Sequence, residues 1–201
     1  MSRNQQINEE KKEERKKKIL SGALKLFAKR GLVATKISDI AQETAMSQGL
    51  IYHYYNSKED IYTELIKTAF KKLIEACYIL EKTEATPKGK IIMAIEGLLK
   101  GLTDNEDTAL YHLLIAQATV SDVTPNEART IIKEHNTVPY DVMTRIFEQG
   151  QKDGTIYHHN ARELSILFWT TINGLAIYKS SHGAKSFTPD LSIITSMFFK
   201  K

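Results

Sequence analysis

This 201-residue sequence lacks cysteine pairs, long apolar runs and an apolar leader. It has a single cysteine, Cys77, which excludes a disulfide within one chain. No stretch of about 18 uncharged apolar residues occurs, so the sequence predicts no membrane-spanning helix. Residues 1–18 are highly charged and have no apolar core, so we expect no secretory signal. We therefore expect a cytoplasmic protein in which Cys77 is a reduced thiol packed in a helix.

Catalytic and metal-binding motifs are also missing. The sequence has no phosphate-binding loop, no HExxH or GxSxG motif, and no acidic pair at an interpretable spacing. The adjacent His158 and His159 have no third ligand, and nothing beside Cys77 suggests a metal cluster. These absences predict a protein that is not an enzyme, binds no metal and uses no cofactor.

Apolar residues recur at helical spacing almost everywhere, and few segments look like strands. The pattern predicts an all-α protein. Gly31 should end the first helix, Thr35 should cap the second, and Pro139 should kink or split a later one. The expected helices cover residues 16–31, 36–45, 47–55, 57–82, 88–102, 106–120, 125–150, 161–181 and 187–200.

The net charge of +4 is concentrated near the N-terminus. Residues 1–60 contain 12 Lys and Arg against 8 Asp and Glu, a balance of +4, whereas residues 61–201 contain 16 of each kind. A local basic excess favours a polyanionic partner for the first third of the chain. The alternative is a solvated, charged start of a helix.

Residues 35–58 have the pattern of a helix-turn-helix, with two short helices and a tight turn. The second helix begins with small and hydrogen-bonding residues, Ser47, Gln48 and Gly49, which suit a helix that enters a major groove. The Gln48 amide can donate to and accept from a base edge, and adenine is its usual partner. The competing interpretation of Gln48 is a solvent-facing residue near the cap.

Four consecutive rings follow, and they cannot all face the core. Tyr55 lies one turn beyond Ile51 and should pack inward with it. Tyr52, His53 and Tyr54 then remain for phosphate oxygens, although His53 could be merely exposed. Phosphate and base contacts are expected from Thr35, Lys36, Ser47, Gln48, Gly49, Tyr52, His53, Tyr54 and Lys58.

Residues 19–66 resemble the DNA-binding domain of the TetR family of bacterial transcriptional regulators. The matching segments are IL-x2-A-x2-LF-x3-G (19–31), T-x-I-x-D-IA (35–41), S-x-G-x-I-Y-x-YY (47–55) and SKED (57–60). The chain departs from the family at Ala45, where glycine is frequent in the turn, at Lys36, and at Tyr54 and Tyr55. Ala45 should make the turn slightly different or strain it mildly.

The resemblance implies an all-α fold of about nine helices. A three-helix helix-turn-helix domain is followed by a larger helical ligand-binding and dimerisation domain. We expect a charged, flexible arm at residues 1–14, the DNA-binding domain at 15–62 and the sensor domain at 63–201. The implied function is a homodimeric repressor that a small, largely apolar effector releases from a palindromic double-stranded operator. The alternative is a DNA-binding protein controlled by a protein partner, or acting architecturally, without a small ligand.

The second domain offers candidates for both roles. Residues 164–178 are apolar nearly all round, so this helix should be buried on one side by its own domain and on another by a second copy. The expected dimer contacts are Leu167, Thr171, Gly174, Leu175, Tyr178, Ile194, Met197 and Phe198. The candidate effector contacts are Tyr111, His112, Ile115, Met143, Phe147, Trp169 and Asn173, whose polar members could instead be satisfied core groups.

Overall fold

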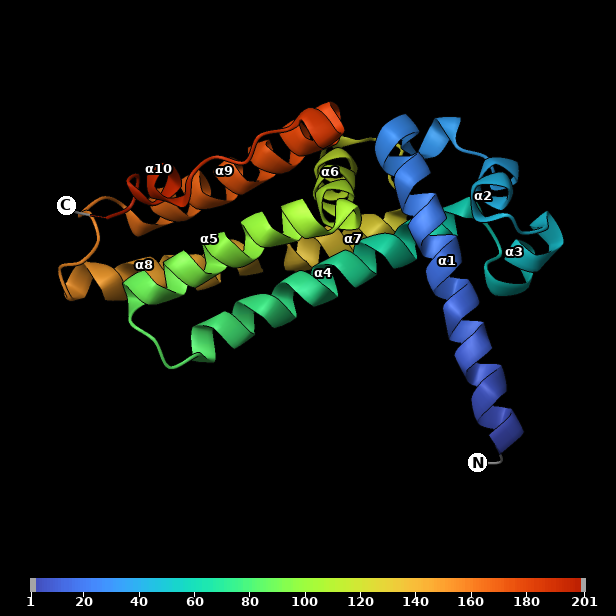
Figure 1. Ribbon diagram of the computed structural model, residues 1–201, viewed down its shortest axis with the longest axis horizontal. Helices are drawn as coiled ribbons and strands as arrows, with labels where there is room; N and C mark the ends of the chain where they lie inside the picture. Colours follow the sequence, from blue (N-terminus) through green and yellow to red (C-terminus); the bar gives the residue numbers. More distant parts are fainter. Residues whose placement is uncertain (1–2, 200–201) are drawn as a thin grey trace. The chain divides into compact units, whose positions relative to one another are not determined.

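The computed structural model describes residues 3–199 (Figure 1). In this part of the chain no strand occurs, and one isolated bridge pairs Ile156 with Phe199. The all-α prediction is therefore confirmed. The helices are α1 (Arg3–Ala34), α2 (Ile37–Thr44), α3 (Gln48–Tyr54), α4 (Lys58–Lys82), α5 (Pro87–Asp104), α6 (Glu106–Val120), α7 (Asn126–His135), α8 (Val138–Lys152), α9 (Ala161–His182), the 3-10 turn η1 (Gly183–Lys185) and α10 (Leu191–Thr195).

Three boundaries differ from the sequence pattern. α1 begins at Arg3, so residues 3–14 of the expected arm are helical. The long helix expected around Pro139 is split into α7 and α8, and the proline lies in the first turn of α8, where its missing N–H costs no bond. α10 ends at Thr195, and residues 196–198 form turns.

The chain forms two compact units, and each unit is made of two separate stretches of the sequence. The first contains residues 1–68 and 114–131, and the second contains residues 69–113 and 132–201. The first therefore includes the C-terminal half of α6 and the start of α7. A division at residue 62 would have placed that segment with the sensor domain.

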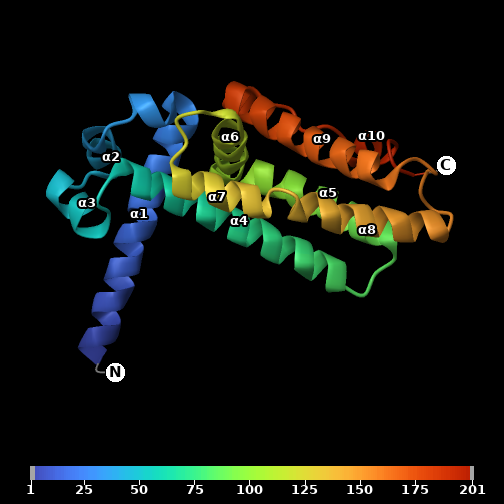
Figure 2. The ribbon, with the colours of Figure 1, turned by 180° about the vertical axis from the view of Figure 1, so that it is seen from behind.

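In the first unit, α1 packs against α2, and α2 against α3 (Figure 2). Gly22 permits the close approach of α1 and α2, because a Cβ atom there would lie 2.5 Å from the Thr44 methyl carbon. Ile40 and Ile51 are fully buried, and the Phe27 and Tyr62 rings meet edge to face at 5.2 Å. Apolar residues at helical spacing thus form a small core under α3.

The connection from α1 to α2 differs from the expected cap. Gly31 adopts φ 78°, a conformation that glycine tolerates. Thr35 is fully buried, and its hydroxyl donates to the Gly31 carbonyl at 2.8 Å. The cap position belongs to Lys36, whose backbone N–H donates to the Asp39 carboxylate at 2.8 Å. The prediction of Thr35 as the cap was wrong, because this hydroxyl closes the preceding turn instead.

The second unit is a helical bundle in which α8 and α9 pack along each other and α5 packs against both. Its core contains the rings of Phe147, Phe168 and Phe198, with centroids of Phe147 and Phe198 5.3 Å apart. Gly150 on α8 leaves room for Ile156, since an added Cβ would lie 2.2 Å from the Ile156 Cδ1. These contacts hold the helices of this unit together.

Candidate functional site

The start of α3 is exposed, and Ser47 caps it. The Ser47 hydroxyl accepts a hydrogen bond from the Leu50 backbone N–H at 3.1 Å. Ser47, Gln48 and Gly49 are all exposed, and a Cβ added at Gly49 would meet nothing within 4 Å. The leading turn of α3 therefore offers an open surface with one amide side chain and one bare backbone position.

The turn before α3 depends on Ala45, which ends α2 in the left-handed conformation with φ 50° and ψ 44°. Ala45 is the one non-glycine residue with positive φ in the described part of the chain. Its backbone N–H donates to the Gln42 carbonyl, and the N–H of Met46 donates to the Ala41 carbonyl. Alanine pays a steric cost in this conformation that glycine avoids, which agrees with the strain expected at this position.

The rings of α3 separate by environment. Tyr52 is 52% exposed and His53 is exposed. The ring of Tyr54 is partly buried and meets His53 edge to face at 5.3 Å. Tyr55 is half-buried, and burial, aided by Glu64 and Glu13, raises the pKa of its hydroxyl to about 12. The outward surface of α3 thus holds Gln48, Gly49, Tyr52 and His53.

Lys58 is held by backbone groups of its own unit. Its ammonium donates to the carbonyl oxygens of Leu32 at 2.8 Å, Val33 at 3.2 Å and Thr35 at 2.9 Å. These carbonyls lie at and just after the end of α1, where helix carbonyls lack partners within the helix. Lys36, by contrast, is exposed and suits a phosphate contact. The two lysines therefore have different surroundings, although both were expected to meet phosphate.

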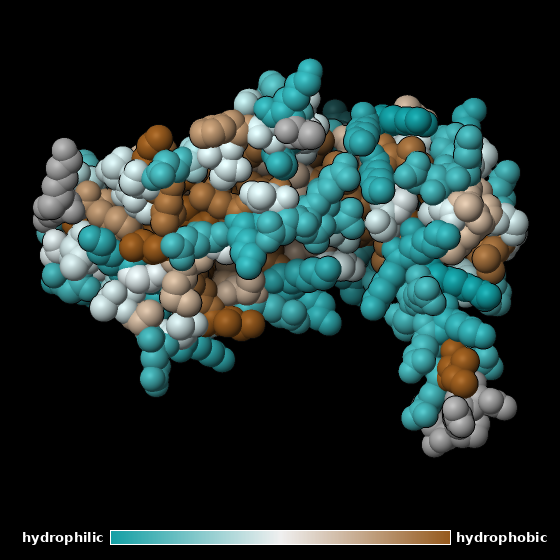
Figure 3. Space-filling model, viewed as in Figure 1, coloured by the Kyte–Doolittle hydropathy of each residue, from teal (hydrophilic) through white to brown (hydrophobic). Residues whose placement is uncertain are grey.

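In the structure the arm is residues 3–18 of α1 rather than the expected 1–14, and it carries much of the basic excess. Lys11, Arg15 and Lys18 are exposed and follow one another at spacings of four and three residues, which places them on one face. Among the described residues of the arm, one ion pair occurs, between Lys16 and Glu13 at 3.7 Å. Hydrophilic side chains cover most of the arm in the space-filling view (Figure 3).

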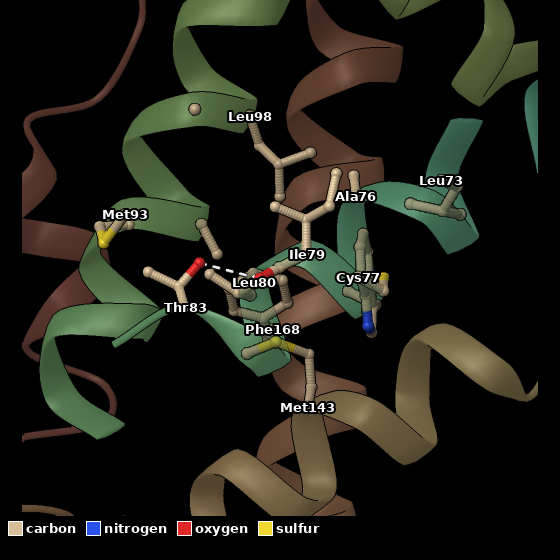
Figure 4. A pocket seen from close by; sticks show the side chains of 13 residues that line it. Leu73, Ala76, Cys77, Ile79, Leu80, Thr83, Met93, Leu98, Met143 and Phe168 are labelled. Carbon is tan, nitrogen blue, oxygen red and sulfur yellow. Dashed lines mark hydrogen bonds between the residues drawn. The ribbon is translucent and has the colours of Figure 1, made fainter. Parts of the chain in front are cut away.

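A cavity of about 420 Å³ opens in the second unit between α4, α5, α8 and α9 (Figure 4). The Thr83 hydroxyl in its wall donates to the Ile79 carbonyl at 2.8 Å. Burial raises the pKa of the Cys77 thiol to about 12, with a smaller effect from Glu81. Among the described residues, no charged side chain lines this cavity, whose wall consists of Leu73, Ala76, Cys77, Ile79, Leu80, Thr83, Met93, Ala94, Gly97, Leu98, Met143, Phe168 and Trp169.

Of the seven candidate effector residues, Met143 and Trp169 line this cavity. Phe147 is buried in the core beside Phe198, and Ile115 lies in the first unit. Tyr111 lies outside the cavity wall, beneath the Lys72 ammonium at 5.8 Å from its ring centroid. The cavity residues on α4 and α5 were not predicted, because the apolar period that lines a cavity is the same as the one that fills a core.

His112 and Asn173 form a polar pair outside the cavity wall. The His112 Nδ1 and the Asn173 Oδ1 are 2.8 Å apart, so α6 and α9 are joined within the second unit. Burial lowers the pKa of His112, and the hydrogen bond to Asn173 opposes that shift. The pair matches the alternative interpretation of these residues, a satisfied polar group inside the protein.

The expected dimer contacts fall into two groups. Leu167, Thr171, Gly174, Leu175 and Tyr178 lie on α9, where Leu167, Gly174 and Tyr178 are exposed and the other two are partly buried. Met197 is partly buried, whereas Ile194 and Phe198 are buried in the core of their own unit. Further exposed apolar side chains in the same part of the sequence are Ile166, Ile177, Phe187 and Ile193. An uncovered apolar face therefore runs along α9.

Residues 3–199 contain neither a metal-binding cluster nor a membrane-spanning helix. Within this range no three His, Cys, Asp or Glu side chains are grouped closely enough to hold a metal ion. None of the helices described is both long and apolar enough to cross a membrane.

Known proteins resemble this chain at the level of sequence and of fold. The profile of the bacterial regulatory proteins of the tetR family matches residues 19–65. The HTH-type transcriptional repressor KstR2 of Rhodococcus jostii (strain RHA1) is 29% identical over 158 residues, which cover 77% of this chain and 74% of that protein.

Solved structures share the fold over nearly the whole chain. The ketosteroid transcriptional regulator KstR2 of Mycobacterium tuberculosis superposes with a TM-score of 0.75 at 18% identity, covering 93% of this chain and 96% of that one. AibR in complex with isovaleryl coenzyme A and operator DNA superposes with a TM-score of 0.69 at 17% identity, covering 91% and 95%.

Proposed function

We propose that this chain is a DNA-binding transcriptional regulator of the tetR family, and that it is a homodimeric repressor controlled by a small effector. In this proposal, α3 reads a palindromic operator in the cytoplasm, and an effector in the α4–α5–α8–α9 cavity lowers operator affinity. The exposed start of α3, with Gln48 and the bare backbone of Gly49, is the observation that carries the DNA-binding role.

Support for repression and for an effector comes from relatives. KstR2 of Rhodococcus jostii is named a repressor, and AibR was solved with both isovaleryl coenzyme A and operator DNA. The uncharged cavity in the second unit has the size and apolar lining of a small-molecule site. The exposed apolar face of α9 supports a symmetric dimer, whose two heads would meet half-sites about 34–36 Å apart, or a multiple of that.

In the proposed interface, the exposed side chains have separate roles. Gln48 reads a base edge, and Tyr52, His53 and Lys36 contact phosphates and fix the register of α3 in the groove. Ser47 caps α3 and keeps its first turn rigid. Thr35 and Lys58 lie beneath this surface and hold the connection between α1 and α2.

Selection of bound fragments from random and genomic DNA tests this function. We expect one palindromic consensus, and we expect Gln48→Ala to change the preferred base at one position in each half-site. If the wild-type protein and the Gln48→Ala variant select the same consensus, Gln48 does not read a base. If the wild-type protein selects no specific sequence, the proposed repressor is contradicted and an architectural DNA binder is favoured.

A further inference from the structure

Charge sets the first limit on what the cavity can bind. None of its lining side chains is ionisable except the Cys77 thiol, and burial keeps that thiol protonated at neutral pH. A carboxylate, phosphate or ammonium group inside the cavity would lose its hydration and find no opposite charge. The cavity therefore selects against ionised groups.

One polar group in the wall has no partner. Trp169 is 5% exposed, and its indole Nε1 is buried without a hydrogen-bond partner among the described residues. The indole N–H is a donor only, so it can be satisfied only by an acceptor. The Thr83 hydroxyl, by contrast, already donates to the Ile79 carbonyl. A ligand oxygen that accepts from the Trp169 N–H would therefore remove the free-energy cost of burying this donor without a partner.

The Trp169 ring is held in place by its neighbours. It meets the Phe168 ring edge to face at 5.1 Å, and the Tyr140 ring lies 6.3 Å away. The Nε1 atom is closed to water in this structure, so a ligand oxygen reaches it only if a neighbouring side chain shifts.

We propose that the effector is an uncharged, largely apolar molecule with a carbonyl or ester oxygen that accepts a hydrogen bond from the Trp169 Nε1. This inference rests on the proposed effector role of the cavity. The apolar part of the molecule lies against Leu73, Leu80 and Leu98. Ile79 and Met93, which are 69% and 48% exposed, continue the apolar wall to the surface, so a longer apolar chain can extend outward.

Fluorescence titration tests the proposal directly, because Trp169 is the single tryptophan of the chain. The probes are four molecules of similar length: 2-nonanone, nonane, nonanoate and nonylamine, at neutral pH. We expect 2-nonanone to bind because the Trp169 N–H replaces the water that its carbonyl loses, whereas nonane binds through apolar contacts alone. Nonanoate and nonylamine should bind more weakly than either.

Two variants separate the donor from the rest of the wall, with affinities measured by calorimetry and folding checked by circular dichroism. Trp169→Phe should keep the affinity for nonane and weaken that for 2-nonanone about tenfold, as the loss of one hydrogen bond to a buried donor allows. Thr83→Val, which removes a hydroxyl from the wall, should keep the wild-type affinity for 2-nonanone.

The outcomes distinguish this inference from the function on which it rests. Tightest binding of nonanoate or nonylamine would overturn the inference while leaving the cavity as an effector site. An unchanged affinity of Trp169→Phe for 2-nonanone would also overturn it. If none of the four probes binds, both the inference and the effector role of the cavity fall, and operator binding is untouched.

Discussion

The ammonium nitrogen of Lys58 lies 2.8 Å from the carbonyl oxygen of Leu32, and this contact joins the first turn of α4 to the end of α1. Two further carbonyls, of Val33 and Thr35, accept from the same nitrogen. A cation surrounded by three carbonyls at a helix end complements the negative end of the helix dipole. Lys58 therefore positions the helix-turn-helix from within the first unit.

Replacement of Lys58 by methionine, of similar length, should lower the free energy of unfolding by about 1–3 kcal/mol, because it leaves three carbonyls without their shared donor. Denaturant unfolding gives the stability, and operator titrations across salt concentrations give the phosphate contribution. The control Lys36→Met should leave stability unchanged and lower the salt slope by about 1. A stable Lys58→Met protein with a shallower salt slope would instead assign Lys58 to phosphate.

Gly49→Ala should separate folding from DNA binding. The added methyl group meets nothing within 4 Å, and alanine favours a helix over glycine by about 0.5–1 kcal/mol, so stability should stay equal or rise. Operator affinity should fall, because the methyl occupies space where the backbone approaches DNA. Gly97→Ala, equally open but on α5, is the control and should leave effector-free operator binding intact. Equal operator affinity in both variants would remove Gly49 from the interface.

Ala45→Gly should raise the free energy of unfolding by about 0.5–1 kcal/mol, since glycine adopts positive φ without the steric cost of a Cβ. Thermal and denaturant unfolding measure the change. The reverse substitution at a second left-handed position, Gly154→Ala with φ 78°, should be destabilising although the space around it is open. A destabilised Ala45→Gly protein would show that the methyl group has a packing role.

The basic face of the arm should add to DNA affinity by neutralising phosphates. The triple substitution Lys11→Gln, Arg15→Gln and Lys18→Gln should reduce the slope of log affinity against log salt by up to about 3, because each neutralised phosphate contributes about 0.9 to that slope. The control removes three exposed lysines of the second unit, Lys82, Lys100 and Lys152, and so makes the same change in net charge. Equal slopes for the two triple variants would mean that the arm acts only through net charge.

The α9 face should form the dimer. Gly174→Arg adds a large charged side chain at an exposed position whose surroundings are open within one chain, so the fold should persist while association is abolished. Sedimentation velocity should show a monomer, and operator affinity should fall because two half-sites are no longer bound together. Val120→Arg, at a valine 84% exposed on α6, should remain dimeric. A dimeric Gly174→Arg protein would place the interface elsewhere.

The local features of the fold could be predicted from the sequence. The split near Pro139 and the strained turn at Ala45 each depend on residues within one turn. The outward position of Gln48, Gly49 and Tyr52 also follows from helix period and the buried Ile51. Helical periodicity along the chain therefore determined the all-α class, and the short motif determined the exposed surface of α3.

Contacts between distant segments required the tertiary structure. Lys58 and Leu32 are 26 residues apart, and the Gln117 amide donates to the Ala28 carbonyl across 89 residues. Residues 114–131 consequently belong to the first unit, which no local pattern indicates. The cavity likewise depends on how four helices pack, because an apolar residue has the same sequence signature whether its side chain meets another side chain or an open space.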